Sequence, residues 1–408
     1  MPDQPRIAII GGGPSGLLLA RLLELNGFTN YLVFERDASE TPGPGQQGGT
    51  LDLHEATGQL ALKRAGLFEE FSNHLARWDA SCIHVVDPQA TTVIRQAAQS
   101  RPEIDRIQLR QLLLDSVPIE KIRWGHGVAS VNRITGIGTR AAAKSHTIQF
   151  KNGTSTSGFD LIVGADGTWS RVRSLITPAN PRYSGKMFIE GRVPCDSAIY
   201  SAAQDMAGSG NMMALGQGKN LNVQQVADGT YRVYFGLQVE EDFQKQFCGD
   251  ETSMTECMRE CFRGPDFFGS WSPKLKQFVE LAEGPFRLWP LYCFDPEEVG
   301  WTRRISPGLT LLGDAAHCST PFAGEGVNCS MQDAVVLADA IIRHCGSSSI
   351  GEETVSDGIE KALAEYEMDM FARGQDLIRK SRTIEEVAYR DDGARELLKL
   401  FQRMAEGA

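Results

Sequence analysis

Three glycines near the start of the chain have the spacing that a bound pyrophosphate requires. Gly11, Gly13 and Gly16 follow the apolar segment 6–10 and precede the leucine-rich segment 17–25. Glycines at these positions permit a tight turn and a close approach of phosphate oxygens to the N-terminus of a helix. Glu35 closes the next apolar segment, where a carboxylate can accept hydrogen bonds from ribose hydroxyls. The pattern predicts a strand, turn and helix that bind a dinucleotide.

The same glycine spacing recurs at Gly43-x-Gly45-x-x-Gly48 and in part at Gly136-x-Gly138. Neither copy has an apolar strand before it and a helical segment after it. A glycine pattern without these flanking elements is weak evidence for a phosphate site. We interpret both copies as turns.

Two further motifs place acidic residues directly after apolar segments. In Gly164-Ala165-Asp166-Gly167, Asp166 is equally compatible with a helix cap and with a ligand contact. In Gly313-Asp314-Ala315-Ala316-His317, Asp314 can accept from a sugar hydroxyl, and the glycine loop 321–328 can present backbone N–H groups. We interpret His317 as a hydrogen-bonded structural residue rather than a base.

The elements that must position these motifs belong to two kinds of sheet. Short apolar runs at 6–10, 31–34, 159–164 and 309–313 are typical of buried parallel strands. Between residues 186 and 240, apolar residues alternate with polar ones, which predicts an antiparallel sheet with one covered face. Helices are expected at 101–117, near 253–262, and from about 358 onward. In the last of these a stripe recurs at helical spacing and should pack on the core: Ile359, Leu363, Tyr366 and Met370.

Composition excludes several classes of protein. The 408 residues carry 41 Lys and Arg against 52 Asp and Glu, a net charge of −11, so neither a nucleic-acid nor a membrane partner is expected. The chain has nine Cys but no C-x-x-C pair, and we interpret Cys257 and Cys261 as helix core, with no metal site. With no secretory leader and no apolar run long enough to span a membrane, we expect a cytoplasmic protein, and by default a monomer.

The three motifs in this order resemble those of the class A, FAD-dependent aromatic monooxygenases, which have the p-hydroxybenzoate hydroxylase fold. The segments Gly48-Gly49-Thr50-Leu51-Asp52-Leu53-His54, Ile104-Asp105-Arg106-x-x-Leu109-Arg110 and Pro321-Phe322-Ala323-Gly324-x-Gly326-Val327-Asn328 are most similar to the tetracycline-inactivating monooxygenases (TetX type). The resemblance spans nearly the whole chain.

This resemblance implies a fold and a set of contacts to the cofactor. The fold class is α/β, with a Rossmann-like FAD-binding domain (1–75, 101–177 and 286–345), an inserted β-sheet substrate domain (76–100 and 178–285) and a C-terminal helical segment (346–408). The implied FAD contacts comprise the glycine turn and ribose carboxylate, the flavin-contacting positions and the loop beside the flavin ring, and Asp166 belongs to a motif shared with NADPH. The residues are Gly11, Gly13, Ser15, Gly16, Glu35, Arg36, Asp52, Arg106, Arg110, Asp166, Asp314, Gly324, Gly326, Val327 and Asn328.

The chain departs from the tetracycline enzymes where they contact flavin and substrate. It has Gly45-Gln46-Gln47 in place of a flavin-contacting Arg, and their two polar substrate contacts align with Glu190 and Asn211, which are different residue types. The resemblance therefore does not imply tetracycline as the substrate. Arg192, on the same expected strand as Glu190, is the candidate for activating an acidic phenol or enolate, and Phe322 and the apolar sheet face are candidate walls of the substrate site.

The implied activity is that of a monooxygenase. NADPH would reduce FAD, and one oxygen atom of O2 would enter a phenolic, enolic or polycyclic small molecule, such as a secondary metabolite or antibiotic, through a flavin C4a-hydroperoxide. The same chemistry can yield epoxidation or Baeyer–Villiger oxidation. An oxidase or dehydrogenase without oxygen transfer, or a flavin-binding regulator without turnover, are the remaining alternatives.

Overall fold

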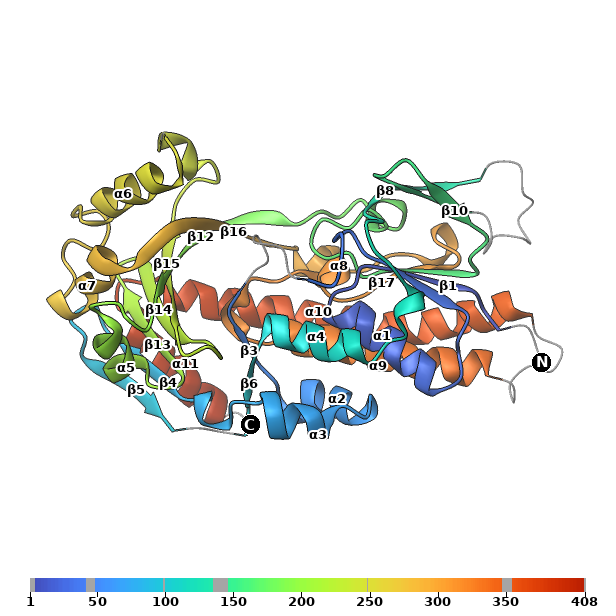
Figure 1. The fold of residues 1–408 in the computed structure, drawn as a ribbon, viewed down its shortest axis with the longest axis horizontal. Coiled ribbons are helices and arrows are strands. Elements are labelled where there is room, and N and C mark those ends of the chain that lie inside the picture. Colours follow the sequence, from blue (N-terminus) through green and yellow to red (C-terminus); the bar gives the residue numbers. More distant parts are fainter. Residues whose placement is uncertain are drawn as a thin grey trace.

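The computed structural model describes residues 4–41, 48–97, 100–134, 146–247, 249–346 and 354–406, and two large sheets organise them (Figure 1). The second and third glycine patterns, and the Gly45-Gln46-Gln47 departure, lie wholly or partly outside these residues. The first sheet is parallel, in the order β17-β11-β1-β2-β7. Its strands are β1 (Ile7–Ile10), β2 (Tyr31–Phe34), β7 (Ile122–Arg123), β11 (Leu161–Gly164) and β17 (Leu309–Leu311).

Helices cover the parallel sheet, which explains why its strands are apolar throughout. The covering helices include α1 (Pro14–Leu25), α4 (Arg106–Asp115) and α9 (Gly326–Cys345). All four residues of β1 and of β11 are buried. Parallel strands that are covered on both faces lose the polar–apolar alternation of a half-exposed strand. The predicted buried strands are confirmed, with ends displaced by up to two residues.

The second sheet is inserted in the chain and contains seven strands in the order β16-β12-β15-β14-β13-β4-β5. Only the β13–β4 pair is parallel. The strands are β4 (Ile83–Val86), β5 (Thr92–Gln96), β12 (Arg182–Val193), β13 (Asn211–Gly216), β14 (Lys219–Gln225), β15 (Tyr231–Gln238) and β16 (Glu283–Cys293). The predicted second sheet is therefore confirmed, and the α/β fold class with it.

The predicted alternation on β15 is confirmed, and its apolar face packs against helices. Tyr231, Val233, Phe235 and Leu237 are buried in one cluster with residues of α6 (Glu251–Phe262) and α7 (Pro273–Leu281). The ring of Phe235 lies 5.3 Å from that of Phe262. A third helix, α5 (Tyr200–Ala207), belongs to the same cluster.

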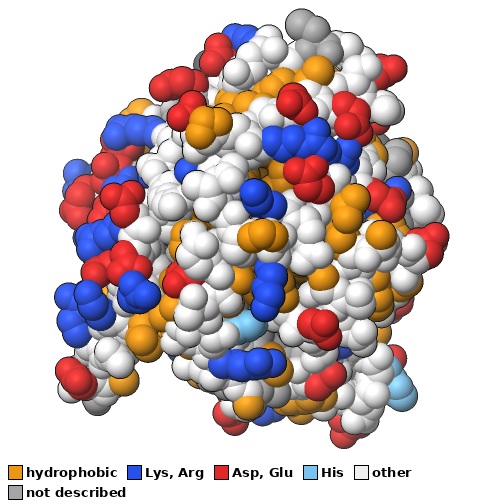
Figure 2. Space-filling view, turned by 90° about the vertical axis from the view of Figure 1, so that its left-hand side faces the viewer, with side chains coloured by type: hydrophobic (Ala, Val, Ile, Leu, Met, Phe, Trp, Pro, Cys, Tyr) orange, Lys and Arg blue, Asp and Glu red, His pale blue; other side chains and the backbone are white. Residues whose placement is uncertain are grey.

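The outer surface at this end of the molecule is polar. Figure 2 shows acidic and basic side chains interspersed over it. On α6 and α7, for example, Arg263 forms ion pairs with Glu260 and Glu280. Exposed pairs of this kind contribute little to stability, about 0–1 kcal/mol each.

Two small sheets complete the β structure. β3 (Thr50–Asp52) pairs with β6 (Glu103–Asp105) between the two large sheets. β8 (Val128–Arg133), β9 (His146–Phe150) and β10 (Ser155–Ser157) form an antiparallel sheet beside the parallel one. The expected helix over 101–117 thus begins only at Arg106, because residues 103–105 pair with β3 and Asp105 caps the helix.

The C-terminal part is helical, as predicted. The 34-residue α10 (Val355–Ala388) runs along the molecule from the parallel sheet toward the seven-stranded sheet, and α11 (Gly393–Glu406) follows it (Figure 1). The predicted stripe on α10 is fully buried in the main core: Ile359, Leu363, Tyr366 and Met370. Short helices α2 (Leu60–Arg64), α3 (Phe68–Glu70) and α8 (Asp314–His317) complete the set.

The prediction that Cys257 belongs to a helix core is wrong. Cys257 is exposed on α6, whereas Cys261 is half-buried, because Thr255, Met258 and Phe262 form the buried face of this helix. Within the described part of the chain, no helix combines the length and the apolarity that crossing a membrane requires. The division of the chain into the ranges given above remains a proposal, and β16 crosses its boundary at residue 286.

Candidate active site

A cavity of about 1020 Å³ lies between the two large sheets. Its near end is lined by the glycine turn after β1 and by the end of β2. Its far end is lined by strands of the seven-stranded sheet and by the C-terminal helices. Of the residues predicted to bind a cofactor or substrate, ten line this cavity: Gly11, Gly13, Glu35, Arg36, Arg106, Arg110, Asn211, Asp166, Asp314 and Phe322.

The glycine turn has the geometry that its sequence predicts. Gly11 adopts φ +113°, and a Cβ there would lie 2.2 Å from the carbonyl oxygen of Ala165. A Cβ on Gly16 would lie equally close to the carbonyl oxygen of Gly11. At Gly13, by contrast, a Cβ would meet no atom within 4 Å. The first and third glycines therefore permit close packing, whereas the second leaves open space at the N-terminus of α1.

Backbone N–H groups hold the carboxylate of Glu35 in place at the end of β2. Its Oε2 accepts from the N–H of Gly12 at 2.6 Å, and its Oε1 accepts from the N–H of Asp37 at 2.9 Å. Each oxygen keeps a second lone pair for a ligand hydroxyl. Arg110 braces the same turn, since it donates to the carbonyl oxygen of Gly12 and to Asp37. Arg36 is exposed beside them.

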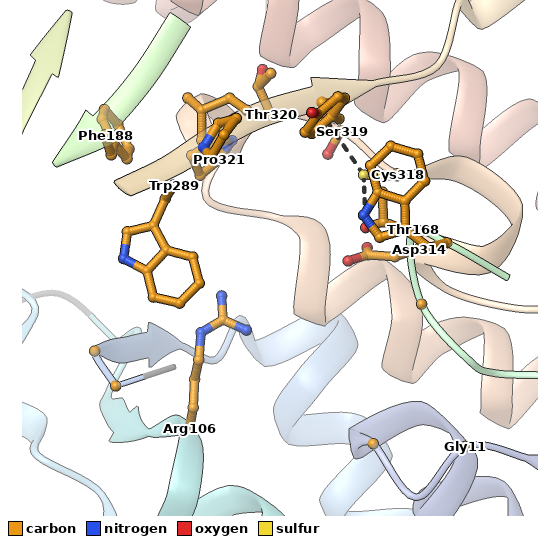
Figure 3. Close-up of a pocket in the computed structure, with 18 of the residues that line it drawn as sticks. Gly11, Arg106, Thr168, Phe188, Trp289, Asp314, Cys318, Ser319, Thr320 and Pro321 are labelled. Atoms are coloured by element: carbon orange, nitrogen blue, oxygen red, sulfur yellow. Dashed lines mark hydrogen bonds between the residues drawn. The ribbon is translucent and has the colours of Figure 1, made fainter. Parts of the chain in front are cut away.

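Arg106 and Asp314 face each other across the middle of the cavity. Figure 3 shows both side chains pointing into the same space, into which the ring of Trp289 also points. Burial among the surrounding chain lowers the pKa of Arg106, and the negative charge of Asp314 partly offsets that effect. An arginine remains charged despite such a shift. The site therefore offers one cation and one anion to a ligand that lies between them.

Asp166 lines the cavity between the glycine turn and Asp314. Its Oδ2 accepts from the N–H of Arg171 at 2.7 Å, whereas its Oδ1 is buried without a partner. Burial raises the pKa of this carboxyl group, and hydrogen bonds from Ser170 and from the backbone oppose the shift. The cap and ligand interpretations are thus compatible, because each uses a different oxygen.

The remaining predicted cofactor residues are not among those that line the cavity. Asn328 joins two segments, since its side-chain oxygen accepts from the N–H of His54 at 2.9 Å and its amide donates to the carbonyl oxygen of Asp52. The Asp52 carboxylate contacts the His54 ring at 2.9 Å. The others lie at the starts of two helices: Ser15 and Gly16 in α1, Gly324 just before α9, and Gly326 and Val327 in its first turn.

His317 is a fully buried structural residue, as predicted. Its Nε2 lies 2.6 Å from Asp333, whose other oxygen accepts from Arg373 at 2.7 Å. Burial favours the neutral ring, but the charge of Asp333 outweighs it and raises the pKa of His317 well above its usual range. Cys329 lies close enough to complete a three-ligand metal set. However, His317 and Arg373 already compensate the negative charge of Asp333, so these three residues need no metal ion to balance it.

The polar face of the seven-stranded sheet, and not the apolar face that we expected, forms the wall at the far end of the cavity. The apolar face of β15 packs on α6 and α7 instead, and the polar face lines the cavity. The sequence interpretation missed these residues because polar strand faces ordinarily meet solvent. They include Asn220, Asn222, Gln224 and Tyr234, with Phe188 and Trp289 beside them.

Of the four predicted substrate residues, two line the cavity and two do not. Asn211 and Phe322 line the cavity. Glu190 lies behind its wall, where it accepts from the indole N–H of Trp289 at 2.8 Å and pairs with Arg232 at 3.8 Å. Arg192 does not reach the cavity: it is exposed, because the cross-strand neighbours of its position are Arg232 and Glu283 at the edge of the covered region. The prediction that Arg192 activates the substrate is not supported.

The C-terminal helices also line the far end, which the sequence interpretation missed. Ile384 and Ala388 of α10 and Leu397 and Phe401 of α11 face the cavity. The signal was present in part, since residues 394–401 repeat apolar side chains at helical spacing. That pattern does not distinguish a helix that lines a cavity from a helix that packs only in the core.

The residues of this cavity fit FAD. The open space at Gly13 would be filled by a Cβ and suits a pyrophosphate, Glu35 suits a ribose, and Asp166 and Asp314 line the same cavity. Arg106 and Asp314 would then flank the flavin half of the molecule.

Comparisons with known proteins agree with this geometry. The family model described as "FAD binding domain" matches residues 5–190 and 302–351. Monooxygenase penA of Penicillium thymicola is 30% identical, over 96% of this chain and 97% of its own length. The structure of Klebsiella pneumoniae HpxO with FAD and uric acid has a TM-score of 0.73 at 21% identity and covers 98% of this chain and 92% of its own. The tetracycline destructase Tet(55) has a TM-score of 0.67 at 18% identity, over 100% and 96% of the two chains.

Proposed function

Because this chain belongs to the family that carries the FAD-binding domain, we propose that it is an FAD- and NADPH-dependent monooxygenase of aromatic or polycyclic small molecules. The substrate would be phenolic or enolic, and one oxygen atom from O2 would be inserted into it. The observation that carries the proposal is one continuous cavity, which runs from a dinucleotide-type glycine turn to a walled chamber for a second molecule.

FAD, when bound, supplies the redox and oxygen-transfer chemistry. The chain supplies the binding, orientation and exclusion of water. The backbone at Gly13 and the carboxylate of Glu35 would hold the ADP half, and Asp314 would accept from a hydroxyl of the linking chain. Arg106, a cation inside the protein, would stabilise negative charge that develops between the sheets.

The far end of the cavity, between the seven-stranded sheet and the C-terminal helices, would form a chamber that holds the substrate next to the flavin. The side chains of Phe188, Phe322 and Trp289 line this end and would exclude water from it, which protects reactive intermediates from side reactions. Glu190 is a positioning residue in this proposal, since its carboxylate fixes the indole ring of Trp289. Burial raises the pKa of Tyr234, so its hydroxyl remains a hydrogen-bond donor at neutral pH.

NADPH as the electron donor and a cytoplasmic location are parts of the proposal that rest on the sequence resemblance. So does hydroxylation, as opposed to epoxidation, Baeyer–Villiger oxidation or an oxidase reaction. Mass spectrometry of product formed under labelled O2 distinguishes oxygen insertion from oxidation without transfer.

The first test is the flavin content of Asp314→Ala. Loss of one charge-assisted hydrogen bond should weaken FAD binding by about 10- to 100-fold. Asp376→Ala is the matched control, because Asp376 is an exposed residue of α10 that pairs only with Arg379 among the contacts described. The visible absorbance of the purified proteins reports bound flavin. If Asp314→Ala retains FAD as fully as Asp376→Ala does, the cofactor assignment is wrong.

A further inference from the structure

Charge is distributed unevenly over the cavity wall. The Asp, Glu, Lys and Arg residues that line it within the described chain all come from segments outside the seven-stranded sheet and the C-terminal helices: Glu35, Arg36, Asp37, Arg106, Arg110, Lys151, Asp166, Arg171 and Asp314. The lining residues from the seven-stranded sheet and the C-terminal helices are apolar, aromatic or uncharged polar. The chamber itself therefore offers an anionic substrate no cation of its own.

Carboxamides form a continuous patch on the wall of this chamber. Asn211 of β13 faces Gln224 of β14 in the register, and Asn222 and Asn220 follow along β14. Side chains two residues apart on a strand lie on the same face. This set, which we call the amide patch, thus occupies adjoining positions on two paired strands.

Several polar atoms of the amide patch have no hydrogen-bond partner in the part of the chain that the structure describes. The side-chain oxygens of Asn211 and Asn222 are buried and have no hydrogen-bond partner. Asn220 lies over Gly236, where a Cβ would come within 2.0 Å of its oxygen, so the opposing strand leaves room for this amide. Buried polar groups without a partner are costly, and in a cavity they point to a ligand that satisfies them.

We propose that the amide patch selects a substrate that is uncharged at neutral pH and carries neighbouring hydrogen-bond donors and acceptors on a planar ring system. This inference rests on the proposed function, because it assigns the substrate class of the same site. A primary amide both donates and accepts, so two or three of them match a ligand that does both, such as a ring-bound amide. A carboxylate would lose its hydration without gaining an ion pair.

The two arginines nearest the patch do not supply that ion pair. Arg232 is cross-strand to Gln224, but it pairs with Glu190 behind the wall. Arg106 begins α4, outside the sheet, and faces Asp314 across the middle of the cavity, so the charge of Asp314 partly compensates it. The chamber thus differs from a site in which an arginine on the sheet receives an acidic substrate.

The test compares 2-naphthamide with 2-naphthoate, which share a shape and differ in charge. Calorimetric titration of the FAD-loaded protein should show that naphthamide binds at least about tenfold more tightly, because the carboxylate is desolvated without a partner. Equal or tighter binding of naphthoate would overturn the proposal, and so would the absence of naphthamide binding.

Variants then locate the preference. Asn222→Leu should weaken naphthamide binding by about 3- to 10-fold through the loss of a hydrogen bond, with bound flavin unchanged. Asn222→Asp keeps the shape and should lower the affinity for naphthoate further. Asn132→Leu makes the first change at an exposed strand position outside the cavity and should alter neither ligand. If Asn222→Leu and Asn222→Asp both bind as Asn132→Leu does, the patch is not the determinant.

Failure of the proposed function would look different. A protein that prefers naphthamide but never transfers oxygen from labelled O2 to any compound would refute the monooxygenase activity and leave the inference intact. Rapid NADPH-dependent oxygenation of carboxylate substrates in preference to neutral ones would refute the inference and leave the proposed function intact.

Discussion

The two ends of the cavity are built in different ways. At the cofactor end, glycines such as Gly11 and Gly13 bring the backbone to the cavity surface, and charged side chains line the cavity around them. At the substrate end, side chains from strands far apart in the sequence make the surface, and they carry no charge. One end is suited to an anionic dinucleotide and the other to a neutral ring system.

Because of this difference, the two ends should tolerate different kinds of substitution. A backbone-built surface is fixed by conformation, so a single added carbon can remove it. A surface built from side chains on a rigid sheet can change one residue at a time, while the strands stay in register. Substitutions at the two ends should therefore differ in kind, and three experiments test that expectation.

The largest effect is expected for the first glycine of the turn. Gly11→Ala must adopt φ +113° and place its Cβ 2.2 Å from the carbonyl oxygen of Ala165. We expect the free energy of unfolding to fall by about 3 kcal/mol or more. Chemical denaturation measures it.

Gly13→Ala is the matched variant, because φ is −82° there and no atom lies within 4 Å of the new carbon. Its stability without FAD should change by about 1 kcal/mol at most, whereas its flavin content should fall sharply. Normal FAD content in Gly13→Ala would show that the pyrophosphate does not approach this glycine.

An intermediate effect is expected at the junction of the two ends, where Glu103 of β6 contacts Thr50 of β3 and lies 3.4 Å from Arg77. Burial raises the pKa of Glu103 to about 7, against the lowering effects of Thr50 and Arg77. The folded protein therefore holds a proton that the unfolded chain releases near pH 4.5, and this contribution to stability is lost as pH rises through 7.

Glu103→Gln should remove that dependence, which we expect to amount to about 1–3 kcal/mol between pH 5 and pH 8. Thermal melting across this range measures the slope of stability with pH. Glu69→Gln, at an exposed position of α3, is the control and should leave the slope unchanged. An unchanged slope in Glu103→Gln would mean that this carboxyl group is ionised in the folded protein at pH 5.

The smallest effect is expected at the substrate end. Phe401→Ala removes an aromatic wall from α11 and should weaken substrate binding by about 3- to 10-fold, with flavin content and stability nearly unchanged. Met404→Ala, exposed on the same helix, should behave as the unmodified protein. Loss of FAD from Phe401→Ala would break the proposed separation of the two ends.

The same difference decides how far the sequence predicts the site. The glycine turn and Glu35 lie within one strand–helix–strand unit, so their spacing along the chain fixes their spacing in space. Asp314 follows a buried strand and was found by the same argument. Motifs of this kind correctly predicted that Gly11, Glu35 and Asp314 lie at one cavity, and their contacts with FAD stay a prediction.

The substrate end could not be derived in that way. Trp289, Tyr234 and Asn222 meet only through the pairing of β16, β12, β15 and β14, and a one-residue change of register would turn each side chain to the other face. Alternation in β15 correctly separated its two faces. It could not show that helices cover the apolar face while the polar face closes a cavity, nor that Arg192 lies outside it.

The long helix α10 joins the two ends, and its length has a consequence for how such a gene can vary. Arg373 pairs with Asp333 of α9, the helix that follows the glycine loop 321–328, whereas Ile384 and Ala388 line the substrate chamber. Inserting or deleting one codon between these points would rotate the far part of the helix by about 100° and shift it by about 1.5 Å. Substitutions can therefore remodel the chamber freely, but changes in the length of this helix cannot, because they would move the chamber wall relative to the cofactor.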